Sequence, residues 1–183
     1  MPEHHYVSPT IAIDDWNSGR KTDVDVFEDQ LSGWIFAPAR VLHPNQHNGT
    51  ALLLLLTPYF EMIASFLRGT ESKGKSTRYL RYGLRRVLPD ATRASIEAYI
   101  NQVRHGVMHE AIFRRVVLHK GQHLPAFGFV RAGPHSTLVV DPFALLGRVE
   151  AHFTDYVRRL RDPSEKVLRR RFDKFWQAKQ ARR

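Results

Sequence analysis

An arginine and a histidine near the middle of the chain have side chains that together could cut RNA without a metal ion. Arg104 carries a planar guanidinium that stays protonated and binds phosphate oxygens in pairs. His109, five positions later, has a ring whose unperturbed pKa of about 6.5 keeps acid and base forms populated near neutral pH. In such a reaction the 2′-hydroxyl attacks phosphorus, a base takes its proton, an acid protonates the leaving 5′-oxygen, and a cation stabilises the phosphorane.

One histidine cannot be the acid and the base at the same time. A two-fold homodimer would solve this problem, because it would bring a second Arg104 and a second His109 to the same groove. His105 is expected to orient the substrate or to contact it, and Asn101 shares its polar face. We therefore expect Arg104 and His109 to be catalytic and His105 and Asn101 to support them.

A helix over residues 91–110 is predicted to position these side chains. At about 100° per residue, an apolar stripe forms on one side of this helix, and the polar residues fan out beside it. The stripe consists of Ile96, Ile100, Val103 and Val107. The polar face could be covered by a partner or a substrate, or it could be an ordinary solvated face with two unengaged histidines.

The motif Arg104-x4-His109, with a polar His105 after the arginine, resembles the R-x4-6-H signature of the HEPN superfamily. The segments Phe60-Glu61-Met62-Ile63 and Tyr82-Gly83-Leu84 add to the likeness, which covers roughly residues 24 to 115. This resemblance implies a helical bundle and, in many members, a metal-independent ribonuclease formed at a homodimer interface. It also implies a setting in toxin–antitoxin or other bacterial defence systems, with an antitoxin or regulatory protein as a further partner.

Glu61 is a carboxylate in apolar surroundings, in the most hydrophobic segment of the chain. A buried carboxylate needs a partner, and Arg104 is one candidate among many arginines. Structural pairing is the favoured role for Glu61, ahead of catalysis.

Two other kinds of function stay open. A metal site could use His105 and His109, which have ligand spacing on a helix, together with Glu110, His119 and His123. Their order is not that of the zincin motif, and we expect neither a metal nor a cofactor. The other alternative is a non-catalytic helical module that binds RNA or a protein partner.

The remaining elements are read from periodicity and caps. Residues 1–22 are expected to form an N-terminal arm, ordered only if Tyr6 or Trp16 docks, and residues 23–183 a single domain. Pro38 predicts a break or a kink, and Pro58 a kink or a restart. Helices are predicted over residues 23–37, 49–67, 76–87, 91–110, 142–160 and 163–183, with a small antiparallel β-meander over 114–140. The fold class is thus mainly α: a HEPN-like helical bundle with the meander inserted before the C-terminal helices.

Basic charge gathers at the C-terminal end. Residues 158–183 hold eleven Lys and Arg against three acidic residues, so +8 of the total net charge of +10 lies there. Such a segment suits an anionic partner, most often nucleic acid, although it could equally be a solvated helix that keeps the protein soluble. The residues expected to bind RNA are Arg169, Arg170, Arg171 and Lys174.

Composition narrows the class of protein. The absence of cysteine excludes disulfides, thiolate zinc sites and cysteine nucleophiles. The first residues lack a secretory signal pattern, and the longest fully apolar run, over residues 51–56, is too short for the roughly 20 residues that span a bilayer. We therefore expect a cytoplasmic protein without a membrane partner, and a HEPN-type endoribonuclease that acts on RNA as a homodimer.

Overall fold

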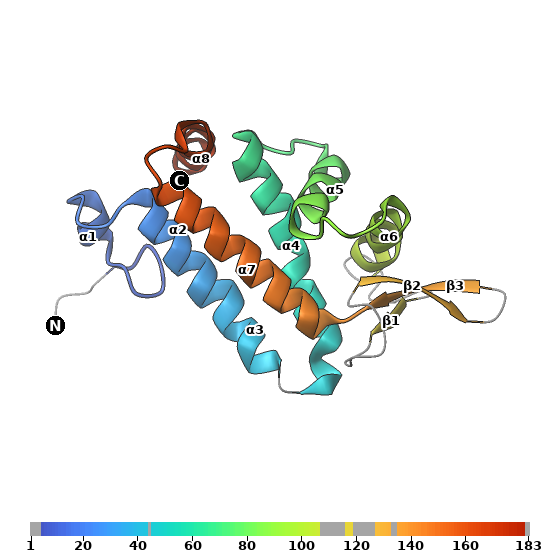
Figure 1. Cartoon of the computed structure of the whole chain (residues 1–183). Coiled ribbons are helices and arrows are strands. Elements are labelled where there is room, and N and C mark those ends of the chain that lie inside the picture. Colours follow the sequence, from blue (N-terminus) through green and yellow to red (C-terminus); the bar gives the residue numbers. More distant parts are fainter. Residues whose placement is uncertain (1–4, 44, 107–115, 119–126, 133–134, 182–183) are drawn as a thin grey trace.

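The computed structural model describes residues 5–43, 45–106, 116–118, 127–132 and 135–181, and it is mainly helical, as the sequence predicts (Figure 1). A small sheet lies at one side of the helices. In the sequence, its strands follow the segment that ends at Gly106 and precede the two C-terminal helices. The helical elements are α1 Ile13–Asn17, α2 Asp23–Leu31, η1 Ser32–Phe36, α3 Ala37–Leu42, η2 Gln46–Asn48, α4 Gly49–Arg68, α5 Ser76–Val87, α6 Arg93–Ala98, η3 Tyr99–Arg104, α7 Pro142–Arg161 and α8 Lys166–Gln180.

Helix α4 is the centre of the bundle. It contacts α3, α5, α7 and α8, and its side chains Leu52, Leu56, Phe60 and Ile63 are fully buried. By length and composition alone, this helix could span a membrane. The fully apolar run inside it, over residues 51–56, is too short to indicate this. However, 56% of its most apolar window is buried inside the bundle, which is the pattern of the core helix of a soluble protein.

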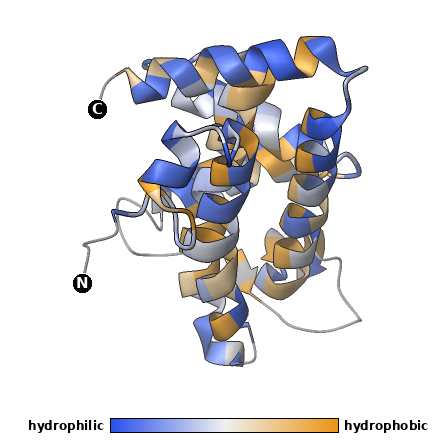
Figure 2. Ribbon diagram, turned by 90° about the vertical axis from the view of Figure 1, so that its left-hand side faces the viewer, coloured by the Kyte–Doolittle hydropathy of each residue, from blue (hydrophilic) through white to orange (hydrophobic). Residues whose placement is uncertain are grey.

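Helix α8 runs across one end of the bundle, end-on in Figure 1 and lengthwise in Figure 2. Its buried face carries Leu168, Phe172, Phe175 and Trp176, as the sequence predicts, while Val167, expected on the same side, is 59% exposed. The Phe172 ring stacks on Phe66 of α4 at a centroid distance of 5.3 Å. Aromatic packing therefore holds α8 against the core helix.

The first long helix does not break at Pro38. Elements α2, η1 and α3 follow one another without a gap from Asp23 to Leu42, so of the expected break or kink the break is wrong. The wide π turn η1, closed by a hydrogen bond from the Ala37 N–H to the Ser32 carbonyl, shifts the bonding register just before the proline. Pro38 thus occupies the first turn of a new helical segment, where its missing N–H is not needed. Likewise α4 passes through Pro58 as one helix, without a restart.

The sheet is not a simple meander. Strands β2 (Phe127–Ala132) and β3 (His135–Val140) form the expected antiparallel hairpin, with Phe127 opposite Val140. Strand β1 (Val116–Leu118) pairs instead with β3, in parallel, so the strand order is β1-β3-β2. Three residues are too few for side-chain alternation to specify the direction of a strand, which explains the error.

The N-terminal arm docks onto the bundle over its described residues 5–22. Val7 and Ile11 are buried in the hydrophobic core, and the buried Gln30 amide donates a hydrogen bond to the Val7 carbonyl at 2.9 Å. Trp16, one of the two residues expected to dock the arm, donates a hydrogen bond from its indole Nε1 to Asp23 Oδ1 at 2.7 Å. Residues 5–22 therefore belong to the packed body of the protein.

Candidate functional site

A groove of about 760 Å³ lies between α4, α8, the loop before α5 and the end of η3. Apolar side chains form most of its wall: Met62, Phe66, Leu80, Phe175 and Trp176. The predicted residues Arg104 and Glu61 both line it, and Lys179 pairs with Glu71 at 3.0 Å on another part of its wall. A largely apolar groove with a few polar groups is typical of a ligand-binding site.

Arg104 and Glu61 are joined through a serine that the sequence analysis missed. The Arg104 Nη2 donates a hydrogen bond to Ser76 Oγ at 2.6 Å, and the Ser76 hydroxyl donates in turn to Glu61 Oε2. The expected partnership of Glu61 with Arg104 therefore exists through an intermediate hydroxyl. Within the described part of the chain, no other group accepts a hydrogen bond from the Arg104 guanidinium, which carries five N–H donors.

A glycine fixes the relative position of Glu61 and Ser76. A Cβ added at Gly83 of α5 would lie only 1.8 Å from the carbonyl oxygen of Phe60, which directly precedes Glu61 in α4. The two helices can approach this closely only because position 83 has no side chain. An isolated glycine inside a helical pattern is the sequence signal that could have indicated this contact.

The segment that carries Arg104 is not a regular α-helix. After α6 the chain enters the π turn η3, and the His105 N–H bonds to the Ile100 carbonyl. The winding is therefore wider than the predicted α-helix, but the predicted faces are confirmed: Ile100 and Val103 are buried, and Asn101 and His105 are exposed. Tyr99 is fully buried, and its hydroxyl shares a 2.9 Å hydrogen bond with Thr57 of α4, which anchors the turn. Such turns are rare and occur often at functional sites.

The predicted site residues around Arg104 have different environments. Arg104 is half-buried at the groove, whereas Asn101 and His105 are exposed. His109 lies outside the described residues, as do Glu110, His119 and His123 of the alternative metal site. The pairing of Arg104 with His109 therefore stays a prediction from the sequence.

Comparison with protein-family models, with curated proteins and with solved structures gives no match for this chain. The groove and the sequence motif are thus the features of this chain that indicate a function.

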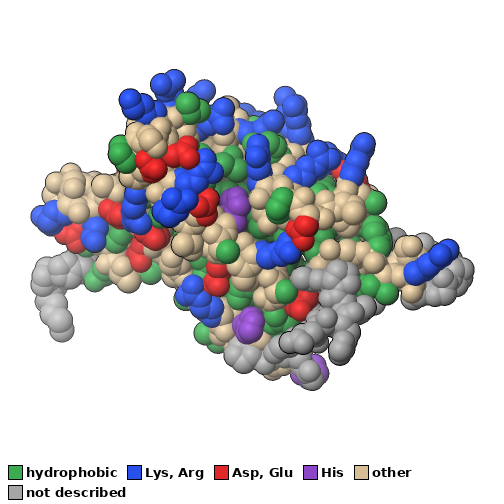
Figure 3. All heavy atoms as spheres, in the orientation of Figure 1, with side chains coloured by type: hydrophobic (Ala, Val, Ile, Leu, Met, Phe, Trp, Pro, Cys, Tyr) green, Lys and Arg blue, Asp and Glu red, His purple; other side chains and the backbone are tan. Residues whose placement is uncertain are grey.

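The basic residues of α8 divide into two kinds. Figure 3 shows Lys and Arg side chains gathered over α8 and α5. Arg169 pairs with Asp173 at 2.8 Å, and Arg171 donates to the Leu67 carbonyl at 3.2 Å, so both are engaged within the protein. Arg170 and Lys174 are exposed and have no acidic partner among the described residues. Of the four residues predicted to bind RNA, these two have a free cationic head.

A second titratable pair lies between α4 and α7. Tyr59 Oη and His152 Nδ1 are 2.8 Å apart. Burial lowers the pKa of His152 and raises the pKa of Tyr59. Both shifts favour the neutral forms, so the pair suits a structural hydrogen bond between uncharged groups.

Proposed function

We propose that this chain is a metal-independent endoribonuclease that acts as a homodimer, with Arg104 and His109 contributed by each copy. One observation carries the proposal: the Arg104 guanidinium is held by Ser76 at the edge of a groove, while its other N–H groups are free among the described residues. The HEPN-like motif and the cation oriented by Ser76 support the same chemistry.

In this proposal Arg104 binds the scissile phosphate and stabilises the negative charge that develops on the phosphorane. Ser76 and Glu61 position the guanidinium, because each fixes the next by a hydrogen bond. Since the partner of Arg104 among the described residues is a neutral hydroxyl, and not a carboxylate, more of its positive charge is left for the phosphate.

His109 takes the proton from the 2′-hydroxyl, and His109 of the second copy protonates the leaving 5′-oxygen. His105, exposed beside Arg104, contacts the substrate. Positioned acid–base groups contribute about 10²- to 10⁴-fold each, which is enough for a slow, selective nuclease. We place this activity in the cytoplasm and, on the resemblance alone, in a toxin–antitoxin or defence setting with a regulatory protein partner.

A second candidate function has its own support. The apolar wall of the groove, and the buried Trp176 Nε1 that lacks an acceptor among the described residues, favour a module that binds a ligand without turnover. Such a module keeps the fold and the groove but does not cleave RNA.

The test is incubation of purified protein with structured and single-stranded RNA in EDTA. Wild type is compared with Arg104→Ala and His109→Ala, and with matched controls Arg93→Ala and His47→Ala, whose side chains are exposed elsewhere. We expect chelator-resistant cleavage that ends in a 2′,3′-cyclic phosphate, abolished in the first two variants only. Cleavage blocked by EDTA would move the activity to the histidine metal site, and absence of cleavage would leave the binding module.

A further inference from the structure

A second groove, of about 1100 Å³, lies between α8, the end of α7 and the start of α2, and it runs along α8 from Lys166 to Ala181. Helix α8 thus lines both grooves: Phe175 and Trp176 line the first, and a row of cations lines the second. The row consists of Lys166, Arg170 and Lys174.

These three cations are evenly spaced on one side of the helix. Positions four apart lie above one another, about 6 Å apart along the helix axis, because each residue rises about 1.5 Å. Lys166, Arg170 and Lys174 are exposed, and none has an acidic partner among the described residues. Like charges at this spacing destabilise a helix by about 0.2–0.5 kcal/mol per pair. Contacts among the described residues therefore do not explain why three cations occur in this row.

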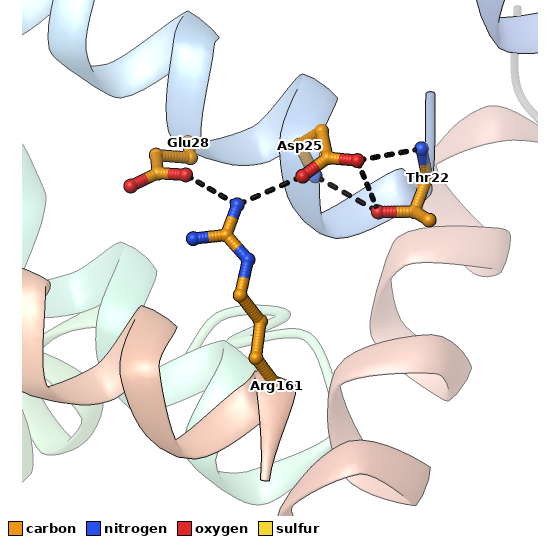
Figure 4. Close-up of polar contacts among 4 residues, drawn as sticks. All are labelled: Thr22, Asp25, Glu28 and Arg161. Carbon is orange, nitrogen blue, oxygen red and sulfur yellow. Dashed lines mark hydrogen bonds and ion pairs between the residues drawn. The ribbon is translucent and has the colours of Figure 1, made fainter. Parts of the chain in front are cut away.

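The acidic groups of the groove are already engaged. Arg161 pairs with Asp25 at 2.8 Å and also with Glu28, while Asp25 accepts from the Thr22 N–H (Figure 4). Asp173 pairs with Arg169, and Asp162 accepts hydrogen bonds from Ser164 in the turn between the two helices. The groove is lined by five Lys and Arg residues and by three Asp residues, so its lining keeps a net charge of +2.

We propose that this groove binds a single strand of RNA through its phosphates, with Lys166, Arg170 and Lys174 each neutralising one phosphate. A regular row of cations in a groove fits the regularly repeated charge of an extended polynucleotide. No aromatic ring lines the groove among the described residues, so it offers no stacking platform and the binding is independent of base sequence. The choice of RNA as the polyanion rests on the proposed function, whereas the position and the chemistry of the groove do not.

The experiment measures binding of a labelled single-stranded oligonucleotide to the full chain at several salt concentrations. All arms carry His109→Ala, so that cleavage does not interfere. The groove variant is Lys166→Gln with Arg170→Gln and Lys174→Gln, and the matched control is Arg78→Gln with Arg85→Gln and Arg93→Gln, which are exposed on α5 and α6. Circular dichroism verifies that both triple variants keep the helical fold.

We expect the slope of log K against log salt to fall by about 2 in the groove variant, because each phosphate contact on a single strand contributes about 0.7. The control variant should keep the slope of the parent. An equal loss in both variants would overturn the proposal, since it would show only a general effect of charge. Unchanged RNA binding with lost binding of a poly-glutamate peptide would overturn it in favour of an acidic protein partner.

The two proposals fail independently in this design. If the wild type does not cleave RNA but the groove variant loses its salt slope, the groove proposal stands and the nuclease proposal falls. If the wild type cleaves RNA and the groove variant binds RNA with the salt slope of its His109→Ala parent, the nuclease proposal stands and the groove proposal falls.

Discussion

The Nη2 atom of Arg104 lies 2.6 Å from the Oγ atom of Ser76, so a neutral hydroxyl orients the cation at the candidate site. The hydroxyl also donates to Glu61. An arginine held in this way has a defined direction and keeps its charge for a substrate. Through this contact Ser76 of α5, which lies outside the Arg-x4-His motif, becomes part of the proposed site.

Replacing Ser76 by alanine should therefore reduce RNA cleavage by roughly 10- to 100-fold, mainly in kcat, because the Arg104 guanidinium loses its orientation. Ser76→Thr, which keeps the hydroxyl, should restore part of the activity. Thr77→Ala is the neighbouring control. Equal activity of Ser76→Ala and wild type would remove Ser76 from the site, and a loss equal in Thr77→Ala would point to a general effect on α5.

Replacing Gly83 by alanine should destabilise the fold by about 1–3 kcal/mol or more, because the new methyl group overlaps the Phe60 carbonyl and α5 must move away from α4. Gly147→Ala in α7 is a matched control. A Cβ at position 147 meets nothing within 4 Å, so that variant should gain up to about 1 kcal/mol in helix propensity. Urea unfolding measures both changes, and a neutral Gly83→Ala would contradict the close helix contact.

The stability of the protein should fall as the pH drops from 7 toward 5, in part through His152. Burial lowers the pKa of this ring below its value of 6.5 in the unfolded chain. Folding therefore favours the neutral ring, so its contribution is complete above the unfolded pKa and is lost as the pH falls through the folded pKa. Thermal melting of His152→Gln should show a weaker dependence on pH over this range. His47→Gln, at an exposed position, should melt with the pH dependence of the wild type.

The ion pair between Asp25 and Arg161 should contribute stability only above strongly acidic pH (Figure 4). Burial alone would raise the pKa of Asp25, but hydrogen bonds from Thr22 and Arg161 lower it to about 2. The contribution is thus complete above the unfolded pKa of 3.8 and disappears as the pH falls through about 2.

Because both side chains are partly exposed, Arg161→Ala should lower stability at pH 7 by no more than about 1 kcal/mol. The difference from wild type should vanish near pH 2. Arg158→Ala, whose partner Asp155 lies on the same helix, serves as the control and should have a smaller effect. A difference that persists below pH 2 would mean that Arg161 acts through packing of its side chain.

Local signals predicted most of the helices. The bounds of α5 are those read from the sequence, and Asp141 caps α7 by accepting hydrogen bonds from the Phe143 and Ala144 N–H groups. Caps and apolar periodicity are properties of short segments, so a single sequence contains them. The two π turns and the parallel pairing of β1 depend on how distant segments pack, and no local pattern specifies them.

The candidate site was predictable in its residue types but not in its connections. The apolar surroundings of Glu61 indicated that it needed a partner, and Arg104 was among the candidates. The bridging role of Ser76 could not be read from the sequence, because it depends on the crossing of α4 and α5 at Gly83. Similarly, Arg169 and Arg171 look like free cations in the sequence, and only the folded chain shows their acceptors.

The packing of α8 on α4 has a consequence for how the chain folds while it is being synthesised. Helix α4, the most apolar segment, leaves the ribosome long before Phe172 and Trp176, which cover Phe66. Until those residues emerge, the nascent chain presents an uncovered aromatic surface that chaperones would recognise and that favours aggregation. A chain that ends before residue 166 should therefore accumulate in inclusion bodies, whereas the chain that includes α8 should fold into soluble protein.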